Sequence, residues 1–363
     1  MNIIVLASAS RCGGALTIFR QFLKHLQNHI GGDRYYVFKD GGVETPVIDG
    51  VEYIVDNNHS VWHRTRFDAK GLKQWCRGRG IVPDLVISFQ NSAANIGCRQ
   101  IVYYHQSLPF YPERWNPFKS DERTLFFYTY VYPLMVKRTL KGDIDAVVQT
   151  ESLRAMFAEC YNFDYEKTHA MFPDVDKIDV ASIVAKSLDA DKFHFIYPAN
   201  AAKYKRHDTL IDALALLRKQ GYEHWDKVRI YLTFSEVANP VITKQIEAAD
   251  VKEQFVFLGQ LPYAELLSYY KAADAMLFPS TIETIGLPLL EGAAFGLPIV
   301  ATDKPYARDV LDGYDGVAHI DSGSPQLWAD EIRRNCRKQY RHKPLAAKES
   351  TWPQFFELIH KQI

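Results

Sequence analysis

The segment FPSTIETIGLPLLEGAAFGLP, residues 278–298, holds the densest group of structural signals in the chain. Pro288 suits the first position of a helix because its missing N–H group is not needed there. Gly296 suits the left-handed position just after a helix, and Pro298 prevents the helix from continuing. The segment therefore predicts a short helix from Pro288 to Phe295, about two turns long.

The amino end of this predicted helix has the features of an anion site. Its free N–H groups and the positive end of its dipole attract negative charge. Gly286 stands just before the helix, where a glycine lets the backbone approach a bulky anion. Glu283 and Glu291 lie on either side, and carboxylates are strong acceptors of hydrogen bonds from hydroxyl groups. We therefore expect a diphosphate at the helix, with one carboxylate near a ribose and the other near a hexose.

Strands and helices alternate on both sides of this segment, which predicts doubly wound parallel sheets of the α/β class. In the first half, the pattern predicts strands at 3–9, 35–38, 51–55, 84–89, 100–105 and 146–149, and helices at 16–30 and 151–160. In the second half, it predicts strands at 193–198, 228–234, 254–258, 275–278 and 299–302, and helices at 207–220, 240–249, 263–273 and 288–295.

With 363 residues, the chain is long enough for two such Rossmann-like domains. The boundary falls between Phe172 and Asp191, where the strand pattern is weak. We assign residues 1–180 to an N-terminal acceptor domain, 181–345 to a C-terminal donor domain and 346–363 to a helix that packs back on the N-terminal domain. Because ligands bind at the carboxyl ends of parallel strands, we expect the domains to face each other across a cleft.

Composition argues against several other classes of function. Lysine plus arginine and aspartate plus glutamate both number 43, so the net charge of zero does not suggest a nucleic-acid partner. Five scattered cysteines without Cys-x-x-Cys spacing argue against a disulfide framework or a zinc site and favour a reducing cytoplasm. The first residues lack a signal-peptide pattern, and no stretch approaches the ~20 apolar residues of a spanning helix.

Residues 193–311 resemble the family-4 retaining glycosyltransferases, which have the GT-B fold, and the N-terminal half resembles them loosely. The resemblance rests on Glu283 and Glu291, with seven residues between them, set between FPS and GLPIVATD. It implies that Glu283 contacts the donor sugar and that Glu291 holds the ribose. It also implies that phosphate is bound by the backbone between the two glutamates, at Thr284, Ile285, Gly286 and Leu287.

The same family carries an arginine and a lysine about five residues apart, after the first strand of the second domain. Lys205 falls at the lysine position, whereas Asn200 stands at the arginine position. Lys203 or Arg206 would restore the missing charge, or the site works with one cation fewer. The alternative is that these side chains form a solvated turn.

Four further residues are assigned by resemblance or by their loops. Gly13 and Gly14 resemble the family's glycine loop, and a plain tight turn is the alternative. His105 resembles the cleft histidine that contacts the donor sugar, and a structural histidine is the alternative. Gly259 lies in the loop where we expect backbone atoms to recognise the donor base, so the sequence identifies neither the base nor the sugar.

The resemblance implies a retaining, hexosyltransferase-type reaction from a nucleoside-diphosphate sugar to an acceptor hydroxyl, in polysaccharide or glycolipid biosynthesis. No cofactor and no metal are expected, because the Asp-x-Asp matches at 143–145, 174–176 and 189–191 are attributed to chance. Two alternatives stay open: a non-catalytic GT-B subunit that binds a nucleotide sugar, and a GT-B sugar-nucleotide epimerase. A nicotinamide oxidoreductase should show Gly-x-Gly-x-x-Gly after the first strand, and this chain does not.

Residues 111–141 form an aromatic segment flanked by basic residues. A helix of this kind fits a membrane surface that presents a glycan or lipid-linked glycan acceptor. A helix packed within the first domain is the alternative. The stretch from His105 to Thr150 resembles transferases that build bacterial surface polysaccharides, which favours peripheral contact with the inner face of the membrane.

Overall fold

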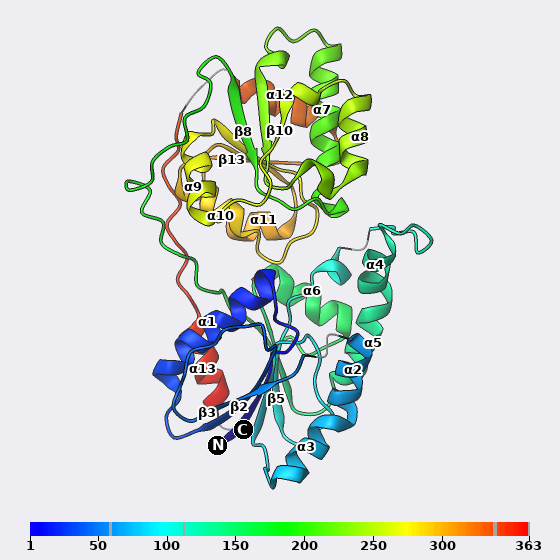
Figure 1. Cartoon of the computed structure of the whole chain (residues 1–363), viewed down its shortest axis with the longest axis vertical. Coiled ribbons are helices and arrows are strands. Elements are labelled where there is room, and N and C mark those ends of the chain that lie inside the picture. The colour runs from blue at the N-terminus through cyan, green and yellow to red at the C-terminus, as the bar shows by residue number, and fades with distance from the viewer. Residues whose placement is uncertain (58–59, 112, 337–339, 362–363) are drawn as a thin grey trace. The chain divides into compact units, whose positions relative to one another are not determined.

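The computed structural model describes residues 1–57, 60–111, 113–336 and 340–361 and divides the chain into two compact units (Figure 1). Unit 1 comprises Met1–Asp174 together with Lys348–Ile363, and unit 2 comprises Val175–Ala347. The break lies inside the stretch 172–191 that is weak in strand pattern. Gln362 and Ile363, the end of the predicted C-terminal segment, and Pro112, within the predicted aromatic segment, lie outside the described residues.

Unit 1 is built on a parallel sheet with the strand order β3-β2-β1-β4-β5-β6-β7. The alternation of side chains along β1 explains its two covered faces, because Ile3 and Val5 join one apolar cluster and Ile4 and Leu6 join another. The strands are β1 (Asn2–Leu6), β2 (Arg34–Lys39), β3 (Val51–Val55), β4 (Leu85–Ser88), β5 (Arg99–Tyr103), β6 (Ile144–Val148) and β7 (Thr168–Ala170).

Helices cover both faces of this sheet. The first cluster buries α1 against α13, where the rings of Phe22 and Phe356 stack with centroids 5.7 Å apart. Two helices of the other face contain a π-helical turn, at Phe67–Gly71 between α2 and α3 and at Phe127–Val131 between α4 and α5. The helices are α1 (Gly13–His29), α2 (Val61–Arg66), α3 (Leu72–Arg79), α4 (Arg123–Phe126), α5 (Tyr132–Thr139), α6 (Glu151–Tyr161) and α13 (Trp352–His360).

Unit 2 repeats the same winding with the strand order β10-β9-β8-β11-β12-β13, again parallel throughout. Its strands are β8 (Phe193–Tyr197), β9 (Val228–Leu232), β10 (Phe255–Phe257), β11 (Ala275–Phe278), β12 (Ile299–Thr302) and β13 (Val317–Ile320). Its helices are α7 (His207–Lys219), α8 (Pro240–Ala248), α9 (Tyr263–Ala272), α10 (Leu287–Ala294), α11 (Pro305–Val310) and α12 (Pro325–Asn335).

Some element ends differ from the sequence prediction. The first strand was expected to reach Ala9 but ends at Leu6, because the chain turns where the Ser10 N–H donates to the Ala7 carbonyl at 2.9 Å. Strand β13 was not predicted, since it is a half-buried edge strand without a continuous apolar run. The predicted helix 288–295 is confirmed as α10, and Gly296 has the expected left-handed backbone, with φ +68°.

Candidate active site

The sheet of unit 2 changes its winding direction between β8 and β11, and the loops after these two strands carry predicted site residues. Lys205 follows β8 and Glu283 follows β11. The Lys205 ammonium donates a hydrogen bond to Oε1 of Glu283, and the two side chains are only 11% and 15% exposed. Because so little water reaches the pair, salt screens it weakly. The fold therefore brings together two charged residues that lie 78 positions apart.

Backbone contacts hold both loops of this ion pair in place. The Tyr197 hydroxyl donates to the carbonyl of Lys205. The carbonyl of Tyr204 accepts two hydrogen bonds from Thr281, from its N–H at 2.9 Å and from its hydroxyl at 3.1 Å. These bonds fix the backbone at Lys205, while Glu283 holds its ammonium.

The amino end of α10 lies at the end of the same loop. Gly286, the residue before the helix, has φ +77°, a conformation that favours glycine. A Cβ atom at Gly286 would come within 3.3 Å of the Tyr306 ring, which is fixed by its hydroxyl bond to the Ser280 carbonyl at 2.7 Å. Ile285 is buried and Thr284 half-buried. No side chain caps the helix. In its first turn Pro288 has no N–H and the Leu289 N–H donates to the Gly286 carbonyl at 2.8 Å, so the predicted phosphate site depends on the N–H groups of Gly286 and Leu287.

Glu291, one turn inside α10, is held by two tyrosines of α9. The Tyr270 hydroxyl donates to Oε2 of Glu291 at 2.9 Å, and Tyr263 also hydrogen-bonds the carboxylate. Burial raises the pKa of Glu291, the two tyrosine hydrogen bonds lower it, and the charge of Asp176 raises it. The net direction is a raised pKa.

The sequence argument missed these two tyrosines as supports of Glu291. A spacing of seven residues places Tyr263 and Tyr270 on one face of a helix, two turns apart. That periodicity was available from the sequence, but only the fold shows that this face meets α10.

The other candidate cations after β8 have different surroundings. Asn200 is exposed, and its Oδ1 accepts the N–H of Ala202 at 3.1 Å, as in a tight turn. The Arg206 guanidinium pairs with the Asp208 carboxylate, with Nε 3.1 Å from each oxygen. Arg206 also has a left-handed backbone, with φ +53°. Lys203 is exposed. Lys205 is thus the predicted cation whose partner is Glu283.

His105 lies two residues beyond β5 in unit 1. Its ring stacks on Tyr103 with centroids 4.7 Å apart, and its backbone N–H donates to Oδ1 of Asn91 at 2.5 Å. Both ring nitrogens are buried without a hydrogen-bond partner in the described part of the chain. Burial lowers the pKa of His105 to about 3, so its imidazole is neutral near pH 7.

The remaining glycines have the conformations that their predicted loops need. Gly13 begins α1 with φ +60°, and space is open around both Gly13 and Gly14. Gly259, after β10, has φ +70° and donates its N–H to the Phe234 carbonyl at 3.2 Å. Within the described residues, no group of three His, Cys, Asp or Glu side chains is arranged to hold a metal ion. The roles of Gly13, Gly14 and Gly259 toward a donor stay predictions.

Comparisons with known proteins show what this chain is similar to. Residues 181–349 match the family described as glycosyl transferases group 1. A D-inositol 3-phosphate glycosyltransferase from Paenarthrobacter aurescens is 26% identical over 203 residues, which cover 54% of this chain and 50% of the relative. The chain spans about half the length of the curated relatives it matches.

Two solved structures show the same fold over most of the chain. WaaG, a glycosyltransferase involved in lipopolysaccharide biosynthesis, has a TM-score of 0.64 at 16% identity, with 93% of this chain and 91% of WaaG covered. HepE of Anabaena, in complex with UDP and glucose, has a TM-score of 0.61 at 17% identity, with 93% and 90% covered. The predicted GT-B fold, with a doubly wound sheet in each unit, is confirmed.

Proposed function

We propose that this chain is a retaining glycosyltransferase, because residues 181–349 match the family described as glycosyl transferases group 1. It moves a sugar from a nucleoside diphosphate to an acceptor hydroxyl without a metal ion. The observation that carries the proposal is the Lys205–Glu283 pair beside the uncapped amino end of α10. Similar proteins are named for inositol 3-phosphate and for lipopolysaccharide biosynthesis, which favours a hydroxyl-rich acceptor such as a glycan or lipid-linked glycan.

The chief task of the protein is to stabilise negative charge on the departing diphosphate. Preorganised N–H groups and cations do this well because they need no reorientation during the reaction. Lys205 and the backbone N–H groups of Gly286 and Leu287 supply them. Without a donor, Glu283 neutralises Lys205. When the diphosphate binds, it replaces Glu283 as the partner of the Lys205 ammonium. The Glu283 carboxylate then accepts hydrogen bonds from the sugar hydroxyls.

Glu291 binds the ribose hydroxyls in this scheme, oriented by Tyr270. Neutral His105 offers a hydrogen bond to the donor sugar. Retention follows from attack on the same face of the sugar, with the donor phosphate accepting the proton of the acceptor hydroxyl. This order of events is carried over from the family-4 resemblance.

Peripheral membrane contact is the second part of the proposal. Exposed apolar side chains project around α4 and α5, with Phe118 95%, Leu134 59% and Val131 39% exposed. Arg123 and Lys137 are exposed on the same helices, and such a mixture suits an anionic lipid surface. The opposite side of the segment packs into unit 1 through Tyr132 and Val136. No described helix has the length and apolar character needed to cross a bilayer.

A thermal-shift panel of UDP, GDP, dTDP and ADP sugars tests the donor site. A ligand present at 100 times its Kd stabilises the folded protein by about 2.7 kcal/mol, which raises Tm. We expect one base to raise Tm of the wild type and of Glu253→Ala, an exposed glutamate control, and to have little effect on Glu291→Ala. An equal response of Glu291→Ala would remove Glu291 from the ribose site.

A non-catalytic nucleotide-sugar-binding subunit is the second candidate, and the exposed Asn200 at the expected arginine position favours it. The same panel separates the two, because a subunit binds the donor without hydrolysing it or transferring its sugar. Turnover of any donor excludes this candidate, whereas a Tm shift without turnover supports it.

A further inference from the structure

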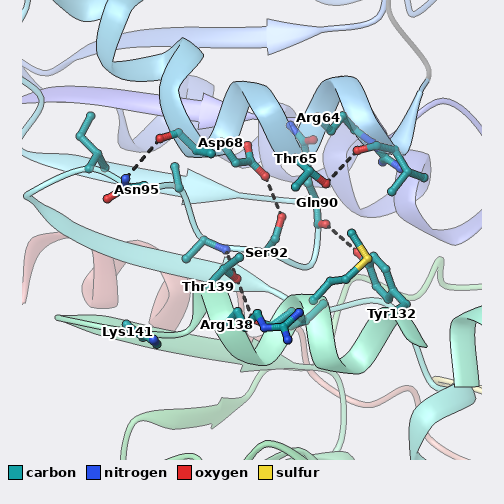
Figure 2. Close-up of a pocket in the computed structure, with 17 residues that line it drawn as sticks. Arg64, Thr65, Asp68, Gln90, Ser92, Asn95, Tyr132, Arg138, Thr139 and Lys141 are labelled. Carbon is teal, nitrogen blue, oxygen red and sulfur yellow. Dashed lines mark hydrogen bonds between the residues drawn. The ribbon is translucent and has the colours of Figure 1, made fainter. Parts of the chain in front are cut away.

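Unit 1 contains a cavity of about 370 Å³ that is lined by none of the predicted donor residues (Figure 2). The connection between β4 and β5, residues 89–98, is described throughout and forms bends and turns without a helix. Parallel strands are usually joined by a crossover of about a dozen or more residues that includes a helix. The cavity occupies the space beside this short connection, between the α2 segment and α5.

Two buried side chains at the cavity carry hydrogen-bond acceptors that lack a donor. Asp68 is 7% exposed, and while its Oδ2 accepts the Ser92 hydroxyl at 2.9 Å, its Oδ1 has no partner within the described residues. Gln90 is 5% exposed, and its Oε1 also has no hydrogen-bond partner among the described residues. An unsatisfied buried acceptor costs about 1–3 kcal/mol. A ligand that presents hydroxyl groups to these two oxygens would recover that free energy.

Three cationic side chains border the same cavity: Arg64 on α2, Arg138 on α5 and Lys141 just beyond α5. None of the three forms an ion pair with a described residue. Guanidinium groups match phosphate oxygens with paired N–H donors. The Arg64 charge acts on Asp68, so the cavity combines positive charge that is only partly compensated with hydrogen-bond acceptors.

Asp68, the acid of the cavity, repels a bound anion less than a fully ionised carboxylate would. Burial raises the pKa of Asp68 to about 7, while the Ser92 hydroxyl and the Arg64 charge lower it. Tyr132, Arg138 and Lys141 face the same space from α5 and its end. Near neutral pH, a large fraction of the Asp68 side chains is therefore protonated and uncharged.

Both helices that border the cavity are interrupted by a π-helical turn next to it. The turn Phe67–Gly71 carries Asp68, and the turn Phe127–Val131 immediately precedes Tyr132. The Tyr132 hydroxyl donates to the Gln90 carbonyl at 3.3 Å, which ties α5 to the loop after β4 (Figure 2). Such turns are rare and occur frequently at functional sites.

We propose that this cavity binds a small phosphorylated sugar or polyol. The hydroxyl groups of the ligand donate hydrogen bonds to Asp68 and Gln90. The phosphate of the ligand binds Arg64, Arg138 and Lys141. The volume lies at the small end of ligand pockets, roughly 300–1,000 Å³, which suits one sugar unit. The inference rests on unit 1 alone and does not depend on the proposed donor site.

Isothermal titration of the full chain tests the proposal with glucose 6-phosphate and myo-inositol 1-phosphate. Glucose alone and inorganic phosphate alone serve as half-ligands, and we expect each to bind at least tenfold more weakly than a complete ligand. Arg138→Ala should weaken binding at least tenfold. Lys137→Ala, an exposed cation of the same helix that does not line the cavity, should leave it unchanged.

Three results would overturn the proposal. The first is that neither phosphorylated compound binds at millimolar concentration. The second is that Lys137→Ala weakens binding as much as Arg138→Ala, which would indicate a diffuse electrostatic effect. The third is that Glu291→Ala abolishes the heat signal, which would place the ligand at the donor site.

Discussion

In unit 2, the Lys205 ammonium is neutralised by Glu283 and its backbone is tied down by Tyr197, whereas the cations of the unit 1 cavity face no acid within hydrogen-bond reach in the described residues. The two regions use the same kinds of side chain. Their difference shows that burial of charge demands a partner, while charge at the rim of a cavity does not. The proposed donor site thus has a charge pair that a ligand must rearrange, and the cavity has charges that a ligand would newly pair.

Removing the ammonium should give the largest effect. Lys205→Ala deletes the proposed stabiliser of the leaving diphosphate and leaves Glu283 without its partner. Loss of one such group costs about 10²–10³ in kcat. Steady-state turnover with the donor found in the thermal-shift panel measures this effect. Arg206→Ala, which removes a cation paired with Asp208, is the control, and an equal loss there would show that Lys205 has no special role.

The cavity acid should give the next effect, and it depends on pH. Because folding raises the pKa of Asp68 from 3.8 to about 7, ionisation opposes the folded state. The contribution of Asp68 to the stability of the wild type is then fully present below pH 3.8 and is lost as pH rises through about 7. The difference corresponds to at most about 4 kcal/mol. Asp68→Asn does not titrate, so it should exceed the wild type in stability at pH 8 and match it near pH 4.

Urea unfolding at the two pH values measures that difference. Ser92→Ala is a useful companion, since it removes the hydroxyl that lowers the pKa of Asp68 and should extend the loss of stability to higher pH. A variant Asp68→Asn that is less stable than wild type at pH 8 would show that the ionised carboxylate is stabilised in the cavity.

The smallest effect should come from the backbone beside α10. Gly286→Ala forces a Cβ atom into a left-handed conformation, which costs about 1–2 kcal/mol, and brings it to 3.3 Å from the Tyr306 ring. Gly259→Ala meets the same backbone cost in open space. We expect Gly286→Ala to lower the free energy of unfolding more than Gly259→Ala does. Equal losses would mean that the Tyr306 ring moves aside without cost.

Much of the local structure around α10 was predictable because its signals are local. Gly286, Pro288 and Gly296 act on the backbone at their own positions, and they set the limits of α10 to within a residue. The apolar runs predicted β11 and β12 as they are found. The strand ends at β8 and β11 then placed Lys205 and Glu283 at the same edge of one sheet.

The cavity in unit 1 was not predictable by such means. Asp68 and Arg138 lie in segments without a clear apolar period, interrupted by π-helical turns that no residue pattern announces. The space between these segments depends on how tightly the loop 89–98 covers the sheet. That is a matter of packing between residues far apart in the chain.

The sequence by itself determined the alternation of strands and helices, the ends of α10 and the pair of glutamates around it. The tertiary structure alone decided that Tyr270 orients Glu291 and that Asp208 pairs with Arg206. It also decided that Asp68 and Gln90 each have a buried side-chain oxygen without a hydrogen-bond partner among the described residues. The physical reason is one of range. Backbone preferences act within a few residues, whereas hydrogen bonds between distant side chains exist only after strand register and helix packing have fixed where each side chain lies.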